Sequence, residues 1–192
     1  TRLGALDIHS YCLHMPIPFF NNSMSFLKRF AKWMSKNYPD VPVNMSEWTH
    51  MQGGRDKGMD SALVTANIMY EDLSVLNVIS WQHWIAVSEV NYCDGLIYIN
   101  LDDKTFEMTK RYYVTGNFSK YVPAGSVCVD AACDDSELRL LAFKYDGGCA
   151  VIVINSTKKE KELSLPEQYS AVKSAVTDDN NNLCEYDIAD PE

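Results

Sequence analysis

The spacing of apolar residues changes along the chain and divides it into two parts. In the first part, short apolar runs predict strands at residues 4–9, 41–45 and 75–84. Apolar residues at three- and four-residue steps predict helices from Asn22 or Ser23 to just before Pro39, at 59–73 and at 104–122. Strands that alternate with helices indicate an α/β barrel or an open parallel sheet, and we favour the barrel.

The helical spacing also predicts which side chains face the core. In the first helix these are Phe26, Leu27, Phe30, Trp33 and Met34, and in the last helix Phe106, Tyr112, Tyr113, Phe118 and Tyr121. The run 75–84 is apolar almost to its end, which suits a parallel strand covered on both faces. Residues 85–103 predict a long loop with a small hairpin, because Asp94-Gly95 is a turn signal.

From Ser126 onward the period falls to two residues. The alternation predicts strands at residues 127–129, 138–145, 149–154 and 161–165. Regularly spaced antiparallel strands are typical of a β-sandwich. We therefore expect an α/β part over residues 1–122 and an all-β sandwich over residues 123–192.

The composition limits the classes of partner that we expect the chain to bind. With 192 residues, 46% hydrophobic content and a formal charge of −9, the chain can bury a core but lacks the basic clusters that nucleic acids or anionic membranes attract. We also find no apolar run long enough to span a membrane. A neutral ligand such as a sugar is compatible with this charge, and we expect no cofactor.

The cysteines do not form a metal-binding motif. They stand at positions 12, 93, 128, 133, 149 and 184, without a CxxC pair. A disulfide within the group Cys128, Cys133 and Cys149 remains an alternative, but buried free thiols are the simpler state. A metal site built from His9, His14, His50 and His83 has little support, because these histidines do not have ligand spacing.

Polar and aromatic side chains gather where the predicted strands end. They are His9, Tyr11, Glu47, Trp48, Trp81 and Trp84, with His50 close by. The carboxyl ends of parallel strands meet at one edge of a barrel, so these residues should converge. Indole rings suit the C–H faces of sugars, and a carboxylate beside a phenol can stabilise an oxocarbenium-like transition state. Taken singly, Trp81 and Trp84 would more often be core residues, and His9 would more often be a hydrogen-bonded core histidine; their co-occurrence at successive strand ends favours a site.

Four segments resemble glycoside hydrolase family 30, which includes glucosylceramidases, xylanases and β-1,6-galactanases. They are Ile8-His-Ser-Tyr11, Met45-Ser-Glu-Trp48, Ser80-Trp-Gln-His-Trp84 and the stretch from Arg111 to Gly125. They are similar, in order, to the sixth, seventh and eighth strands of the family's barrel and to its last helix. The resemblance implies the C-terminal part of a (β/α)8 barrel, about strands 6 to 8, followed by a side β-sandwich that lacks its last strand.

The same resemblance implies a double-displacement mechanism with Glu47 as the nucleophile. His9, Tyr11 and Trp81 would surround the reacting sugar, and a non-proline cis peptide would follow Trp81. From their places near the strand ends we add further substrate-binding candidates, namely Trp48, His50, Trp84 and Glu89.

One catalytic group does not match. The family's acid/base Glu follows an Asn at the end of the fourth strand, and this chain has no Asn-Glu dipeptide. A retaining site needs two carboxyl groups about 5 to 5.5 Å apart. We therefore expect a fragment of a secreted enzyme, inactive alone, with any export signal upstream and with barrel edges open to self-association. The substrate would be β-1,6-galactan, xylan or a similar β-linked glycan, and the alternative is a non-catalytic glycan-binding or structural module.

Overall fold

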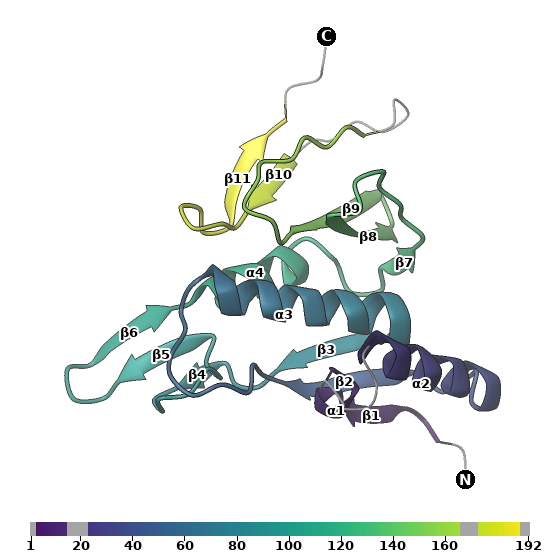
Figure 1. Ribbon diagram of the computed structural model, residues 1–192, viewed down its shortest axis with the longest axis horizontal. Helices are drawn as coiled ribbons and strands as arrows, with labels where there is room; N and C mark the ends of the chain where they lie inside the picture. The colour runs from purple at the N-terminus through teal and green to yellow at the C-terminus, as the bar shows by residue number, and fades with distance from the viewer. Residues whose placement is uncertain (1–2, 15–22, 166–172, 189–192) are drawn as a thin grey trace.

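A three-stranded parallel sheet organises the first part of the chain. The computed structural model describes residues 3–14, 23–165 and 173–188, and places β1 (Leu6–His9), β2 (Val43–Trp48) and β3 (Ser80–His83) side by side in that order (Figure 1). The short helix α1 (Tyr11–His14) follows β1, and α2 (Ser23–Asn37) precedes β2. The predicted strand and helix alternation is therefore confirmed, although these strands form an open sheet and not a closed barrel.

Within the described ranges, apolar packing covers one face of this sheet. Val43 and Met45 of β2 are buried against the helices, whereas Asn44 between them points to the other face. There its amide donates to Asp7 Oδ1 over 2.8 Å and its oxygen accepts from Ser80 Oγ over 2.8 Å. Because Ser80 of β3 takes part in this polar row, the expectation that the strand at 75–84 is apolar on both faces is wrong.

The third strand is shorter than its apolar run suggests. Helix α3 (Met59–Glu71) continues into a π-helical turn, η1 (Asp72–Leu76), so the first residues of the run at 75–84 are helical. Asn77 then adopts a left-handed conformation with φ 52°, which ends the turn. Leu76 and Val78 are buried all the same, so the apolar run reflects burial and not one continuous strand.

The predicted helix at 104–122 is correct only for its middle. Helix α4 covers Lys110–Ser119, because the Thr109 side chain caps its start by accepting from the Tyr112 amide over 3.3 Å. The preceding residues form β6 (Thr105–Met108), which pairs with β5 (Ile97–Asn100), and β5 pairs with β4 (Val87–Ser88). Phe106 is consequently 69% exposed and does not pack inward.

Helix α2 has the predicted position but a narrower buried face. Leu27 and Met34 are buried, whereas Phe26 is 40% and Trp33 50% exposed. Trp33 instead contacts aromatic neighbours at the surface, with ring centroids 6.2 Å from Phe30 and 5.3 Å from Tyr38. The inward prediction for Phe26 and Trp33 is wrong, since no described element covers that side of the helix.

The C-terminal part is built from two small antiparallel sheets. Strands β7 (Val127–Val129), β8 (Leu138–Tyr145) and β9 (Gly148–Asn155) form one sheet, and β10 (Lys173–Val176) pairs with β11 (Cys184–Asp187). The first three strands were predicted. Residues 161–165 are not a strand, since Leu163 and Leu165 are 39% and 41% exposed and their alternation marks no buried face.

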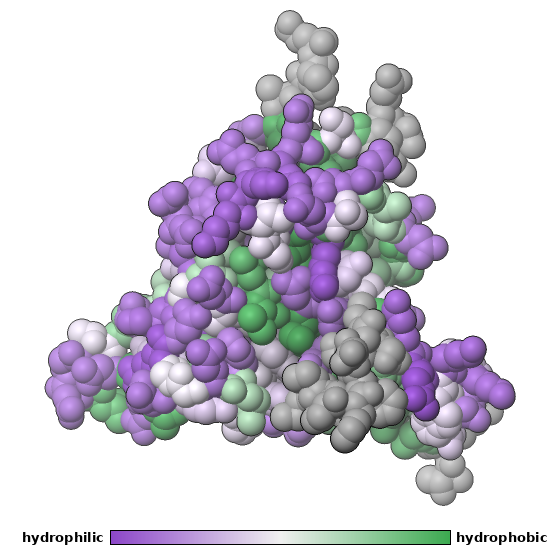
Figure 2. All heavy atoms as spheres, in the orientation of Figure 1, coloured by the Kyte–Doolittle hydropathy of each residue, from purple (hydrophilic) through white to green (hydrophobic). Residues whose placement is uncertain are grey.

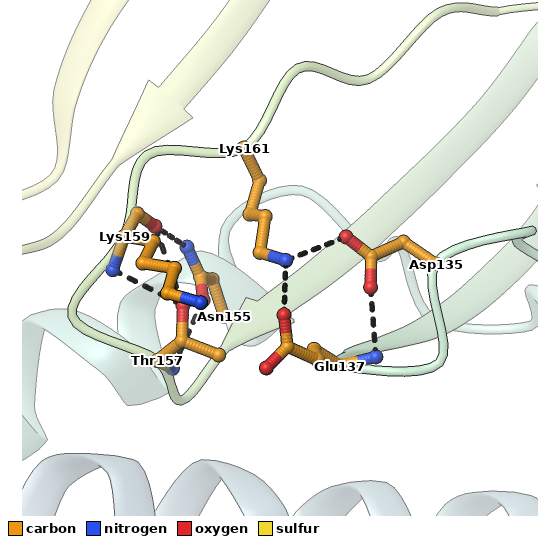
Figure 3. A network of polar contacts seen from close by, with 6 residues as sticks. All are labelled: Asp135, Glu137, Asn155, Thr157, Lys159 and Lys161. Carbon is orange, nitrogen blue, oxygen red and sulfur yellow. Dashed lines mark hydrogen bonds and ion pairs between the residues drawn. The ribbon is translucent and has the colours of Figure 1, made fainter.

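Polar contacts hold the segment after β9 in place. Lys161 forms ion pairs with Asp135 and Glu137, which precede β8, and Thr157 donates to Asn155 over 2.7 Å (Figure 3). The ion pair with Lys161 lowers the pKa of Asp135 and raises that of Lys161. These contacts fix the chain by side-chain bonds instead of a strand ladder.

The two parts share a hydrophobic core. Side chains of α3 and α4 pack against β8 and β9 through Ala62, Ala66, Met69, Val114, Phe118, Leu141, Phe143, Ile152 and Ile154. Helix α3 thus lies between the parallel sheet and the C-terminal strands (Figure 1). Outside this core the visible face is largely hydrophilic, with a smaller apolar area near its middle (Figure 2).

All six cysteines are free. Cys93 is buried, as expected of a structural thiol. Cys12 and Cys149 are exposed, so the expectation of buried free thiols is wrong for these two residues. Among the described residues there is no group of three or more His, Cys, Asp or Glu side chains arranged to hold a metal ion. No helix in the described ranges is long and apolar enough to cross a membrane.

Candidate active site at the carboxyl ends of the parallel strands

The candidate site centres on Glu47, the penultimate residue of β2. Its pairing partner on β1 is His9, and the register slips by one residue between Ile8 and His9. A second irregularity lies on the β3 side, between Met45 and Trp48. Bulges re-aim side chains at strand ends. The side chain of Glu47 is 26% exposed, so its carboxylate is sheltered but still open to a ligand.

Two side chains from the β1 end contact the same carboxylate oxygen. The Tyr11 hydroxyl donates to Glu47 Oε1 over 3.3 Å, and His9 Nδ1 lies 3.6 Å from that oxygen. The two rings meet edge to face, with centroids 6.3 Å apart. Three of the predicted site residues are therefore brought together, as expected from strand ends that meet at one edge.

The pKa of Tyr11 is raised to about 12, first by burial and then by the Glu47 charge and hydrogen bond. The phenol accordingly stays protonated throughout the neutral range. It can donate continuously to the carboxylate, which holds one oxygen in place.

Two of the aromatic residues predicted to bind a sugar, Trp48 and Trp81, lie on the face of the sheet that packs against the core. Trp48 is 5% exposed and belongs to the core, and its ring centroid is 6.1 Å from that of Trp81. Trp81 is part-buried, packs against both core clusters, and donates its indole N–H to Asp72 Oδ2 over 2.9 Å. Little of Trp48 is left for a sugar to contact.

Trp84 differs from the other indoles because it is 51% exposed. Its backbone N–H donates to the Trp48 carbonyl over 2.9 Å, which keeps it beside the end of β2. The chain contains a non-proline cis peptide here, between Trp84 and Ile85. The prediction of a cis bond after Trp81 is wrong, since that residue lies inside β3, where strand pairing with β2 continues as far as His83.

His50 and Glu89 are not brought to Glu47 by any direct contact. His50 Nδ1 lies 3.7 Å from Cys93 Sγ, and burial together with the nearby Arg111 charge lowers the pKa of His50. Glu89 has an exposed side chain and a carbonyl that accepts from Arg55. It lines a separate open hollow of about 410 Å³, together with Arg55, Ile99, Asn100, Leu101 and Asp102.

A buried polar network next to the site escaped sequence reasoning. Asp72 accepts hydrogen bonds from Ser10, His14 and Trp81, and the other ring nitrogen of His14 contacts Glu71 Oε2 at 3.0 Å. The sequence offered two signals for this network. One was the adjacent acids Glu71 and Asp72 in the predicted helix at 59–73, and the other was His14 in the loop after residue 9. Neither signal alone shows which side chains these residues contact.

Comparison with known proteins confirms the resemblance to glycoside hydrolase family 30. Residues 32–98 match the family model described as O-glycosyl hydrolase family 30. Lysosomal acid glucosylceramidase of Mus musculus is 26% identical over 159 residues, which cover 77% of this chain and 28% of that protein. The chain therefore spans little more than a quarter of the length of this relative.

Solved structures show the same fold. A conserved exported protein from Bacteroides fragilis superposes with a TM-score of 0.79 at 19% identity, covering 96% of this chain and 42% of that one. The family 30 subfamily 8 xylanase from Clostridium acetobutylicum gives 0.65 at 17% identity over 97% and 42%. An endo-β-1,6-glucanase gives 0.53 at 23% identity over 88% and 37%.

Proposed function

This chain is related to glycoside hydrolase family 30, and from that relationship we propose that it is part of a retaining enzyme that cleaves β-linked glycans. Glu47 is the nucleophile. The observation that carries the proposal is the double contact of Tyr11 and His9 with Glu47 Oε1 at the carboxyl end of a parallel strand. In this proposal β1, β2 and β3 are the last strands of a (β/α)8 barrel, and the C-terminal strands form its side β-sandwich.

The contacts on Oε1 suggest how the carboxylate would react. Because Tyr11 and His9 both occupy Oε1, attack on the anomeric carbon is assigned to Oε2. The glycosidic bond breaks, its oxygen leaves with a proton from a general acid, and a glycosyl ester forms on Glu47. Water then cleaves the ester and releases the sugar with its original configuration. The proposal assigns only the nucleophile to this chain and leaves the acid/base to another part of the enzyme.

The substrate is proposed as a neutral β-linked polysaccharide such as β-1,6-galactan or xylan. The exposed ring of His9 beside Glu47 offers a surface for a sugar, and so does the half-exposed indole of Trp84, whose backbone is bonded to the end of β2. A net charge of −9 is compatible with a neutral ligand. Similar proteins include a xylanase, an endo-β-1,6-glucanase and a glucosylceramidase. We place the enzyme outside the cell, in line with the similar protein described as exported.

A mechanism-based inhibitor tests the assignment of the nucleophile. A 2-fluoro glycoside with a good leaving group is incubated with the full-length enzyme, and the labelled peptide is identified by mass spectrometry. The ester is expected on Glu47 and is expected to disappear in Glu47→Gln. A label on another carboxylate, or no label in an enzyme that hydrolyses glycans, would refute the proposal.

A glycan-binding module without catalysis is the second candidate, favoured by the exposure of Trp84 at the site. Isothermal titration of xylo- and galacto-oligosaccharides into the 192-residue chain separates the two. Binding that Trp84→Ala abolishes and Glu47→Gln leaves intact, in a full-length protein with no glycosidase activity, supports the module.

A further inference from the structure

Asp72 is fully buried and connects three separate elements. As the first residue of η1, it accepts from Ser10 Oγ at 3.0 Å and from the Trp81 indole at 2.9 Å through Oδ2. Its Oδ1 lies 3.0 Å from His14 Nε2. The partners come from the end of β1, from β3 and from α1. A carboxylate with this many donors is a strong local anchor, because charged hydrogen bonds are the stronger kind.

The donors to Asp72 are neighbours of the proposed reacting groups. Ser10 has no exposed surface and stands between His9 and Tyr11, the two residues that contact Glu47. A bond from the Ser10 side chain therefore restrains the backbone that carries both of them.

On the β3 side, the restraint acts through an indole. Trp81 is opposite Met45 in the strand register, and its ring packs beside Trp48, the residue that follows Glu47. Asp72 thus holds side chains on both neighbours of β2, one in β3 and one at the end of β1.

The position of Asp72 is itself the product of a local irregularity. Helix α3 changes to π-helical geometry at Asp72, and π-helical turns often occur at functional sites. Burying a carboxylate is unfavourable unless it is well paired, so the burial here depends on Ser10, His14 and Trp81 together. The loss of Asp72 would leave these donors without their acceptor.

We propose that Asp72 is a positioning residue for the nucleophile site: through Ser10 and Trp81 it keeps Tyr11 and His9 in contact with Glu47. This inference rests on the proposed role of Glu47. Asp72 itself lies beneath the sheet and touches no substrate in this proposal.

The chain offers a matched control in the adjacent residue. Glu71 contacts the other ring nitrogen of His14 and the Arg139 guanidinium, but neither Ser10 nor Trp81. Glu71→Gln therefore disturbs the same network without touching the link to the site. Asp72→Asn weakens that link, because a neutral amide oxygen accepts the bonds of Ser10 and Trp81 less strongly than a carboxylate does, and Ser10→Ala removes the bond from Ser10.

The first measurement is geometric and uses the 192-residue chain. Nuclear Overhauser contacts between the rings of His9 and Tyr11 are recorded for the wild type and each folded variant. Asp72→Asn and Ser10→Ala are expected to weaken these contacts, while Glu71→Gln keeps them. If Asp72→Asn does not fold, Ser10→Ala, which removes one hydroxyl, decides the result.

The second measurement is kinetic and uses the full-length enzyme with the fluoro glycoside. Asp72→Asn and Ser10→Ala are expected to lower the maximal labelling rate of Glu47 at least ~10-fold with little change in inhibitor affinity, because misplaced groups slow chemistry. Glu71→Gln should lower thermal stability but keep that rate.

The two measurements separate the possible failures. Unchanged ring contacts and rates in Asp72→Asn and Ser10→Ala, or equal effects of Glu71→Gln, would show that Asp72 has a general structural role only. A wild-type enzyme that is not labelled at Glu47 would refute the proposed function, and the ring contacts in the isolated chain would still decide the role of Asp72.

Discussion

His14 is predicted to make the stability of the fold fall as pH rises above neutrality. Its side chain is 7% exposed and lies between two carboxylates, with Nδ1 3.0 Å from Glu71 Oε2 and Nε2 3.0 Å from Asp72 Oδ1. Burial by itself would lower the pKa of His14. The hydrogen bonds and charges of Asp72 and Glu71 outweigh it and raise the pKa from 6.5 to about 9.

The size of the effect follows from proton linkage. Between pH 6.5 and pH 9 the folded chain binds one more proton at His14 than the unfolded chain, so each pH unit removes about 1.4 kcal/mol of stability. The interval therefore accounts for roughly 3 kcal/mol. This stabilisation is complete below pH 6.5 and is lost as pH rises through about 9.

Glu71 sets the acid limit of the pH range in which the same cluster stabilises the fold. Burial tends to raise the pKa of Glu71, but its hydrogen bonds to His14 and Arg139 lower it below the ordinary value of 4.5. Its contribution is complete above pH 4.5 and is lost as pH falls through the lowered pKa. The cluster is therefore most stabilising between about pH 4.5 and 6.5.

The assay is urea unfolding of the 192-residue chain, followed by tryptophan fluorescence at four pH values from 6.5 to 9. The wild type should lose about 3 kcal/mol of unfolding free energy over this range, and His14→Gln, which carries no titrating proton there, should lose less than about 1 kcal/mol. Parallel pH profiles for the two proteins would refute the reasoning, because His14 would then not be charged in the fold.

Three further outcomes are expected. Met45→Ala, at a fully buried position of β2, should destabilise the chain by about 3 kcal/mol, whereas Phe106→Ala at a 69% exposed position should change stability by less than about 0.5 kcal/mol in the same urea assay. Tyr11→Phe should slow labelling of Glu47 by about 10-fold through the lost charged hydrogen bond, measured by mass spectrometry; an unchanged rate would show that the contact does not act. The isolated chain should self-associate through β1 and β3, the edges of its parallel sheet, and sedimentation that does not depend on concentration would contradict this.

Local patterns predicted most elements because each pattern has a local cause. Helix α2 begins at Ser23 and ends before Pro39, as its apolar spacing and the proline require. The failed part of the predicted helix at 104–122 has an equally definite cause. A segment that can be read as helix or strand becomes a strand in β6, because β5 offers it a pairing partner that the local pattern cannot reveal.

The sequence by itself determined that His9, Tyr11 and Glu47 stand at or just after the ends of consecutive predicted strands, because the spacing of apolar residues sets where each strand ends. Only the tertiary structure decided that Trp48 is buried while Trp84 is half exposed, and that Asp72 reaches Ser10 from 62 positions away. The spacing of apolar residues carries information about a few residues along one strand or helix. The burial of an indole and the satisfaction of a buried carboxylate depend on which distant elements close around them.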